Sequence, residues 1–273
     1  MPLAVRMELL NEVIRLRETE ALTYSQIIRV IERTRGLVLS KSTISYWVTR
    51  KHSPLGRIQR FDAKPSPELA YIIGVIAGDG SLNVYKNTYR VRLQAVDLDF
   101  VREFDKCLCV VLGARPHNIW RGAGRREYHV DVSSFQLHQF LMTRAVDLSA
   151  FVEYDARCVS SFLRGFFDSE GSVSKVGDLT VSNSDRSLLM YVQELLSRYF
   201  EIETSGPYLG TRKGTEIVRR GKRYIRTRDC YVVRVRRKCV LKFSEEVGLT
   251  SARKVLRLTL LKTDKVTVGV QNS

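Results

Sequence analysis

Apolar positions follow two regimes along this 273-residue chain. Over about residues 3–48 they recur at the three-to-four residue spacing of amphipathic helices, in segments 3–20, from about 23, and 40–48. Thr23 and Gln26 have the Thr-x-x-Gln form of a capping box at the start of the second helix, and Gly36 marks a turn before the third. We therefore predict a small all-α domain at residues 1–55, followed by a proline-containing linker at 56–67.

Beyond residue 67, short apolar helices alternate with strands that have a two-residue period. The first half reads as an apolar segment at 71–80, a strand at 89–96, a helix at 98–112 and a strand at 127–132. The same order returns at 162–171, 178–182, 187–200 and 231–236. We therefore predict an α+β domain at 68–273 built by internal duplication, with repeat one at 68–157, repeat two at 158–262 and pseudo-twofold symmetry.

The two apolar segments that open the repeats are copies of one motif. The first reads YIIGVIAGDG from Tyr71, and the second reads FLRGFFDSEG from Phe162. If the two segments are paired helices, Gly74 and Gly165 allow the backbones to approach closely. Gly80 and Gly171 are expected to take the left-handed conformation that ends a helix.

Each copy ends in a carboxylate, Asp79 or Glu170. An acid is unfavourable at the negative end of a helix, and two acids brought together raise each other's pKa unless a cation lies between them. Mg²⁺ binds through one or two carboxylates together with water and phosphate oxygens, which suits phosphodiester hydrolysis. The plainer alternative is two buried helices that merely end in Asp-Gly and Glu-Gly turns.

Charge narrows the class of partner. The formal net charge of +16 and pI near 9.9 indicate that the binding partner is a polyanion. Nucleic acid is favoured over a membrane, since no stretch approaches the roughly 20 apolar residues of a membrane span. The start lacks a long apolar signal region, so a cytoplasmic location is expected. Five cysteines without a Cys-x-x-Cys and four scattered histidines indicate neither a disulfide framework nor a zinc ribbon.

The N-terminal pattern resembles a helix-turn-helix DNA reader, although three-helix bundles with polar surfaces are also common. The strands and the long basic segment at 212–228 are the other expected contacts with double-stranded DNA. The predicted DNA-binding residues are Lys41, Ser42, Thr43, Ser45, Tyr46, Arg50, Lys51, Arg90, Arg92, Arg121, Arg125, Arg212, Lys213, Arg219, Arg220, Lys222, Arg223, Arg234 and Arg236.

With its doubled motif and basic strands, the chain resembles a single-chain LAGLIDADG homing endonuclease over about residues 68–262. The resemblance implies a duplicated αββαββα domain with two DNA-facing antiparallel sheets. It also implies Mg²⁺ or Mn²⁺ held by Asp79 and Glu170 at the scissile phosphates. Gly78 and Ser169, which precede the two acids, join the metal-site candidates. Asp168 is expected to have a helix-end or packing role.

One departure from that family concerns a lysine or glutamine that members often carry at the end of the second strand. The corresponding positions here are Ala95 or Val96 and Ser184. The candidates for replacing it are Gln94, Lys175 and Lys254.

Two functions follow. The first is a monomeric endonuclease that makes a staggered double-strand cut at a long DNA site. The alternative is a catalytically weak or inactive scaffold that serves as a DNA-binding transcriptional regulator or intron maturase. An intron RNA has no motif in its favour.

Overall fold

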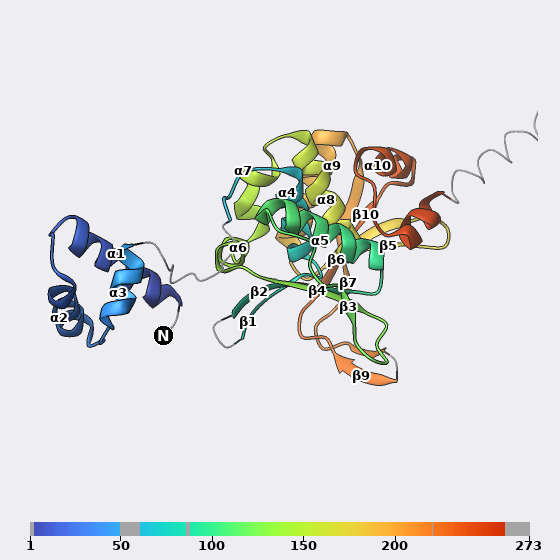
Figure 1. Cartoon of the computed structure of the whole chain (residues 1–273). Coiled ribbons are helices and arrows are strands. Elements are labelled where there is room, and N and C mark those ends of the chain that lie inside the picture. Colours follow the sequence, from blue (N-terminus) through green and yellow to red (C-terminus); the bar gives the residue numbers. More distant parts are fainter. Residues whose placement is uncertain (1–2, 50–60, 86–87, 220, 260–273) are drawn as a thin grey trace, which may run out of the picture. The chain divides into compact units, whose positions relative to one another are not determined.

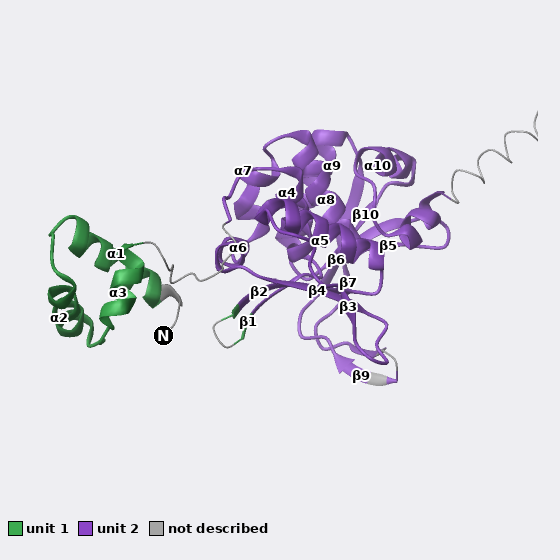
Figure 2. Ribbon diagram, viewed as in Figure 1, with its two compact units in different colours: residues 1–59, 84–88 green, residues 60–83, 89–273 purple. Residues whose placement is uncertain are grey.

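The computed structural model describes residues 3–49, 61–85, 88–219 and 221–259 (Figure 1). It divides the chain into two compact units (Figure 2). Unit 1 comprises residues 1–59 and 84–88, and unit 2 comprises residues 60–83 and 89–273. Much of the predicted linker, residues 56–60, lies outside the described residues.

Unit 1 contains the three predicted helices, α1 (Leu3–Glu18), α2 (Tyr24–Arg35) and α3 (Lys41–Val48). The capping box is formed, because the Thr23 side chain accepts from the Gln26 backbone while the Gln26 side chain accepts from the Thr23 backbone. Gly36 ends α2 with φ +63°, a conformation that favours glycine. In α1 the buried residues are Leu9, Val13 and Leu16, which recur at helical spacing.

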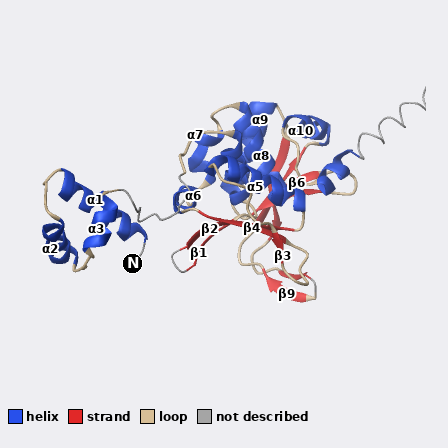
Figure 3. Ribbon diagram, viewed as in Figure 1, coloured by secondary structure: helices blue, strands red, loops and turns tan. Residues whose placement is uncertain are grey.

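Unit 2 follows the predicted duplicated order, with helices packed against two sheets (Figure 3). Repeat one contains α4 (Pro67–Ala77), β1 (Ser81–Tyr85), β2 (Thr88–Ala95), α5 (Leu98–Leu112), β3 (Trp120–Arg121), β4 (Tyr128–Ser133), α6 (Phe135–Leu141), η1 (Ala145–Leu148) and α7 (Ser149–Val152). Repeat two contains α8 (Ala156–Glu170), β5 (Gly171–Val173), β6 (Leu179–Asn183), α9 (Arg186–Phe200), β7 (Thr204–Thr211), β8 (Glu216–Arg219), β9 (Lys222–Ile225), β10 (Cys230–Val235), η2 (Arg237–Cys239) and α10 (Val240–Glu246). Residues 252–259 form a further helical segment.

The two four-stranded sheets have the same strand order. The first is β1-β2-β4-β3 and the second is β5-β6-β10-β7. Their central pairs are antiparallel, with Arg92 opposite Asp131 in the first sheet and Val233 opposite Val181 in the second. The extra hairpin β8-β9 lies in the long basic segment of repeat two.

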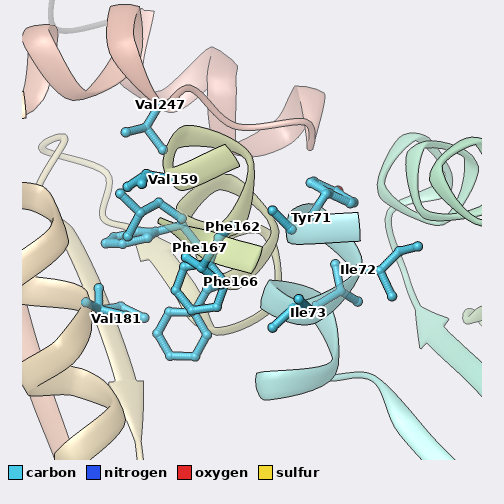
Figure 4. Packing of buried hydrophobic residues seen from close by; sticks show 14 of the residues in the cluster. Tyr71, Ile72, Ile73, Val159, Phe162, Phe166, Phe167, Val181 and Val247 are labelled. Carbon is cyan, nitrogen blue, oxygen red and sulfur yellow. The ribbon is translucent and has the colours of Figure 1, made fainter. Parts of the chain in front are cut away.

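Helices α4 and α8 lie side by side within the core of unit 2 (Figure 4). A Cβ atom added to Gly74 would lie 2.2 Å from the carbonyl oxygen of Phe162, and one added to Gly165 would lie 2.4 Å from that of Tyr71. Such distances are far below van der Waals contact, so only glycine permits this backbone approach. The structure thus places both glycines at the helix interface, as the motif predicts.

The expected left-handed caps at Gly80 and Gly171 are wrong. Neither glycine has a positive φ, and Gly171 has φ −74° and ψ 143°. Both are needed for space instead. A Cβ at Gly171 would lie 2.2 Å from the carbonyl oxygen of Phe167, and one at Gly80 would lie 2.6 Å from Cδ1 of Ile76. The chain therefore turns back closely over the last turn of each helix.

Among the described residues, none of the helices combines the length and the apolar character that a membrane crossing requires.

Candidate active site and nucleic-acid interface

Asp79 and Glu170 come together because the helices that precede them end side by side. Gly78 caps α4, and Glu170 is the last residue of α8. A Cβ at Gly78 would lie 2.4 Å from Cβ of Ser169 and 3.0 Å from Cγ of Glu170. The two helix ends are therefore in direct contact at Gly78, Ser169 and Glu170, three of the four residues predicted to form the metal site, and Asp79 directly follows Gly78.

Burial and mutual repulsion perturb the two acids. Burial raises the pKa of Asp79. Burial, followed by the negative charge of Asp79, raises the pKa of Glu170 to about 7. Two close carboxylates that resist ionisation are an arrangement in which a bound cation is strongly favoured.

Lys254 places a positive charge at the end of α8, where it offsets the negative charge of the helix end and of the two acids. Its side chain is only 6% exposed, and Nζ donates to the carbonyl oxygens of Phe167 at 3.0 Å and Asp168 at 2.5 Å. This is the negative end of α8, where a cation is favourable. The ammonium group also lowers the pKa of Asp79 and of Glu170, while burial lowers the pKa of Lys254 itself. Of the three support candidates, Gln94 and Lys175 are exposed, on β2 and in the turn between β5 and β6.

The residues just before Lys254 are bound to the start of α5, and these contacts hold Lys254 in place. Ser251 Oγ donates to Oδ2 of Asp97 at 2.6 Å, and Arg253 forms an ion pair with the same carboxylate at 3.0 Å. The backbone N–H of Ala252 donates to Asp99. These bonds fix the short segment that carries the buried ammonium group.

The Asp168 carboxylate is hydrogen-bonded to other parts of the protein and is not assigned to the metal site. Its buried carboxylate accepts from the Tyr71 hydroxyl at 2.9 Å and from the Thr250 backbone N–H at 2.8 Å. Because Tyr71 belongs to α4 and Asp168 to α8, the bond ties the paired helices together. This geometry agrees with the packing role expected for Asp168.

In repeat two, the polar side chain at the end of the second strand that faces the acid is Asn183, one position before the expected Ser184. Nδ2 of Asn183, at the end of β6, donates to Oε1 of Glu170 at 3.1 Å. Strand alternation gives the reason, since Leu179 and Val181 are buried and Asn183 lies two positions further on the same face. Arg226, from the basic segment, also lowers the pKa of Glu170. The matching position of repeat one is Ala95, so the two acids have different surroundings.

The outer face of the first sheet is less cationic than predicted. Along β2, Val91 and Leu93 are buried, whereas Arg90, Arg92 and Gln94 lie on the opposite face. Asp131 on β4 forms ion pairs with Arg90 at 3.4 Å and Arg92 at 3.6 Å. The Arg92 guanidinium also lies over the Trp120 ring, which stacks on His129.

Arg234 on β10 and Arg236, just after the end of that strand, are exposed and line a groove with Tyr208. In the basic segment, Arg212 and Lys213 are exposed, and Arg223 forms an ion pair with Glu216 at 3.3 Å. At the end of β3, Arg121 donates to the carbonyl oxygen of Arg125, an exposed residue between β3 and β4, at 2.7 Å.

On α3, Lys41, Ser42 and Tyr46 are exposed, and Thr43 and Ser45 are half-buried. Arg50, Lys51 and Arg220 lie outside the described residues, as do the side chains of Arg219 and Lys222. The predicted DNA-binding residues are thus spread over both units.

Comparison with known proteins identifies the domains of unit 2. The family model described as a LAGLIDADG-like domain matches residues 157–248, and that of the WhiA LAGLIDADG-like domain matches residues 68–116. Uncharacterized protein MJ0398 of Methanocaldococcus jannaschii is 35% identical over 260 residues, which cover 93% of each chain.

A solved structure supports the same fold. I-DmoI in complex with DNA and Ca matches with a TM-score of 0.51 and 20% identity, over 72% of this chain and 98% of that one. Full-length DUF199/WhiA from Thermatoga maritima matches with a TM-score of 0.47 and 18% identity, over 75% of this chain and 63% of that one. The duplicated α+β fold and the resemblance drawn from the motifs are confirmed. With one domain match in each repeat, the chain belongs to the LAGLIDADG family.

Proposed function

We propose that this protein is a metal-dependent DNA endonuclease that hydrolyses phosphodiester bonds at a long recognition site. The observation that carries the proposal is the contact of two helix ends that brings together the exposed Asp79 and the half-buried Glu170, two carboxylates with raised pKa values. A fold needs no such pair for stability, because two neighbouring acids that raise each other's pKa destabilise it. Perturbed acids of this kind are characteristic of functional sites.

The donor set fits Mg²⁺ or Mn²⁺. Asp79 and Glu170 offer hard carboxylate oxygens, and the backbone carbonyls of Gly78 and Ser169 are the further candidate donors at the same helix ends. When bound, such an ion supplies positive charge to the phosphate and lowers the pKa of water.

The surrounding residues have separate tasks in this proposal. Asn183 orients the Glu170 carboxylate through its hydrogen bond at 3.1 Å. Lys254 favours the ionised form of the two acids, because its charge lowers the pKa of both. Arg226 does the same for Glu170 alone.

Double-stranded DNA is the proposed substrate because the whole chain has a net charge of +16 and exposes arginines on the strands and in the basic segment. In support, I-DmoI, which shares the fold, has been crystallised with DNA and Ca. The predicted helix-turn-helix role of unit 1 would extend the contacted site.

One observation favours the alternative of a DNA-binding regulator or maturase without cleavage. Repeat one has Ala95 at the strand position where repeat two has Asn183, so its half of the site lacks the hydrogen bond that Glu170 receives. A scaffold that only binds DNA would tolerate this asymmetry.

The test is incubation of the full chain with genomic DNA or a randomised duplex library and Mg²⁺, followed by sequencing of all new ends. Parallel samples contain EDTA, an Asp79→Asn/Glu170→Gln double variant, or Glu194→Gln, a matched change at an exposed acid on α9. Discrete, staggered ends from the wild type and Glu194→Gln alone would support the nuclease. Salt-sensitive binding without ends would support the alternative, and ends from the double variant would refute the assigned acids.

A further inference from the structure

Three chemically different ligand groups converge on the C-terminal half of α5, outside the site of the paired acids. Asp105 and Cys109 are four residues apart on α5 and so share one face of the helix. His117 comes from the loop between α5 and β3. One potential ligand atom from each of the three lies within 4.8 Å of the other two.

Burial marks Asp105 as unusual. It is 5% exposed in the middle of a helix, where an aspartate is rarely placed without a positive partner or a metal. Its Oδ1 lies 2.7 Å from Nδ1 of His117 and 3.8 Å from Sγ of Cys109. The His117 backbone N–H also donates to this carboxylate, at 3.2 Å to Oδ2, which fixes the loop beside the helix.

The distances approach those of a tetrahedral zinc site. With metal–ligand lengths of about 2.3 Å to sulfur and about 2.0 Å to nitrogen, two ligands of this kind lie about 3.5 Å apart. Sγ of Cys109 lies 3.8 Å from Nδ1 of His117. The nitrogen and carboxylate oxygen, now hydrogen-bonded at 2.7 Å, need only separate to about 3.3 Å, which small side-chain rotations provide.

We propose that Asp105, Cys109 and His117 bind one Zn²⁺, with water at the fourth position. A thiolate, an imidazole and a carboxylate form a donor set that suits Zn²⁺ and not Mg²⁺. Binding replaces the thiol proton of Cys109, which is released to solvent, and puts a double positive charge next to the buried carboxylate. Nδ1 of His117 is the nitrogen that faces both other ligands, because it lies 2.7 Å from Oδ1 of Asp105 and 3.8 Å from Sγ of Cys109.

The ion would pin the loop that leads into β3. His117 is three residues before Trp120, whose ring stacks on His129 at 5.5 Å and lies beneath Arg92. The role that we assign to the ion is therefore to hold the edge strand β3 in register with β4. The proposal does not rest on DNA cleavage.

The test is metal analysis of the full chain after zinc loading and exhaustive dialysis, followed by cobalt titration of metal-free protein. We expect one equivalent of zinc and, with Co²⁺, a near-ultraviolet thiolate-to-cobalt absorption band. Cys109→Ser and His117→Gln should each lower the zinc affinity at least about 10-fold. Cys239→Ser, a buried thiol on η2, is the matched control and should bind as the wild type does.

A second readout does not depend on any variant. In native wild-type protein, zinc should slow alkylation of Cys109 by iodoacetamide, with no change at the other four cysteines, as read by mass spectrometry. Stoichiometry well below one, no cobalt–thiolate band, or equal alkylation of Cys109 with and without zinc would overturn the proposal.

Discussion

Substituting Gly74 by alanine tests whether backbone contact between α4 and α8 holds the core together. The new Cβ would lie 2.2 Å from the Phe162 carbonyl oxygen, about 1.2 Å short of ordinary contact. A backbone atom cannot rotate away, so the helices must separate. Overpacking of this kind costs about 3 kcal/mol at the upper end, and alanine in a helix returns about 1 kcal/mol. We expect a net loss of about 2 kcal/mol in the free energy of unfolding.

The assay is urea unfolding followed by fluorescence of Trp120 in a Trp47→Phe background, so that the signal reports unit 2. Gly124→Ala is the control, because Gly124 has φ +68° but no atom within 4 Å of a new Cβ. It should cost only the backbone strain of about 1 kcal/mol.

The two substitutions should also differ at the candidate site. Separated helices would expose Glu170 to water, and its pKa should fall from about 7 toward 4.5 in Gly74→Ala, with no change in Gly124→Ala. Gly74→Ala with full stability and an unchanged Glu170 titration would refute the close-contact reasoning.

Further predictions concern charge, caps and DNA. Because Glu170 has a raised pKa in the folded protein, the free energy of unfolding in EDTA should decrease by at most about 3 kcal/mol as the pH rises from 4.5 to 7. That of Glu170→Gln should decrease less over this range, and a variant whose pH profile runs parallel to that of the wild type would contradict the prediction. Tyr71→Phe removes a donor from the buried Asp168 carboxylate and should cost about 2 kcal/mol in urea unfolding, a loss that an unchanged midpoint would exclude. Thr23→Ala should destabilise unit 1 by about 1 kcal/mol, seen by Trp47 fluorescence, and leave the Trp120 signal unchanged. Arg234→Gln should lower the slope of log affinity for DNA against log salt by about 1, whereas an unchanged slope would remove Arg234 from the interface.

Local patterns in the sequence were sufficient for the elements and for the central helix pair. The duplicated motif identified Gly74 and Gly165 because glycine at matched helical positions has a direct steric meaning, and the strand and helix segments follow from apolar periodicity. The acids Asp79 and Glu170 were found for the same reason, since a carboxylate at a helix end conflicts with the helix dipole. Their metal-binding role stays a proposal.

Other parts of the site depend on contacts that no local pattern records. Lys254 reaches the end of α8 from a segment 84 residues beyond Glu170, and only the tertiary fold brings them together. Asn183 was missed by one position, because the strand boundary decided which side chain faces the helices. The Asp105, Cys109 and His117 cluster escaped a search by sequence spacing, since His117 approaches α5 only after the chain reverses at Gly113.

The backbone contact at Gly74 and Gly165 has a consequence for how such a protein can diversify. Because main-chain atoms fix the spacing of the two helix ends, that spacing is independent of the side chains on the outer faces of the sheets. Arg90, Arg92 and Arg234 can therefore be exchanged without moving Asp79 relative to Glu170. In this scaffold the ligand-contacting surface of the sheets can therefore change while the distance between the paired acids stays fixed.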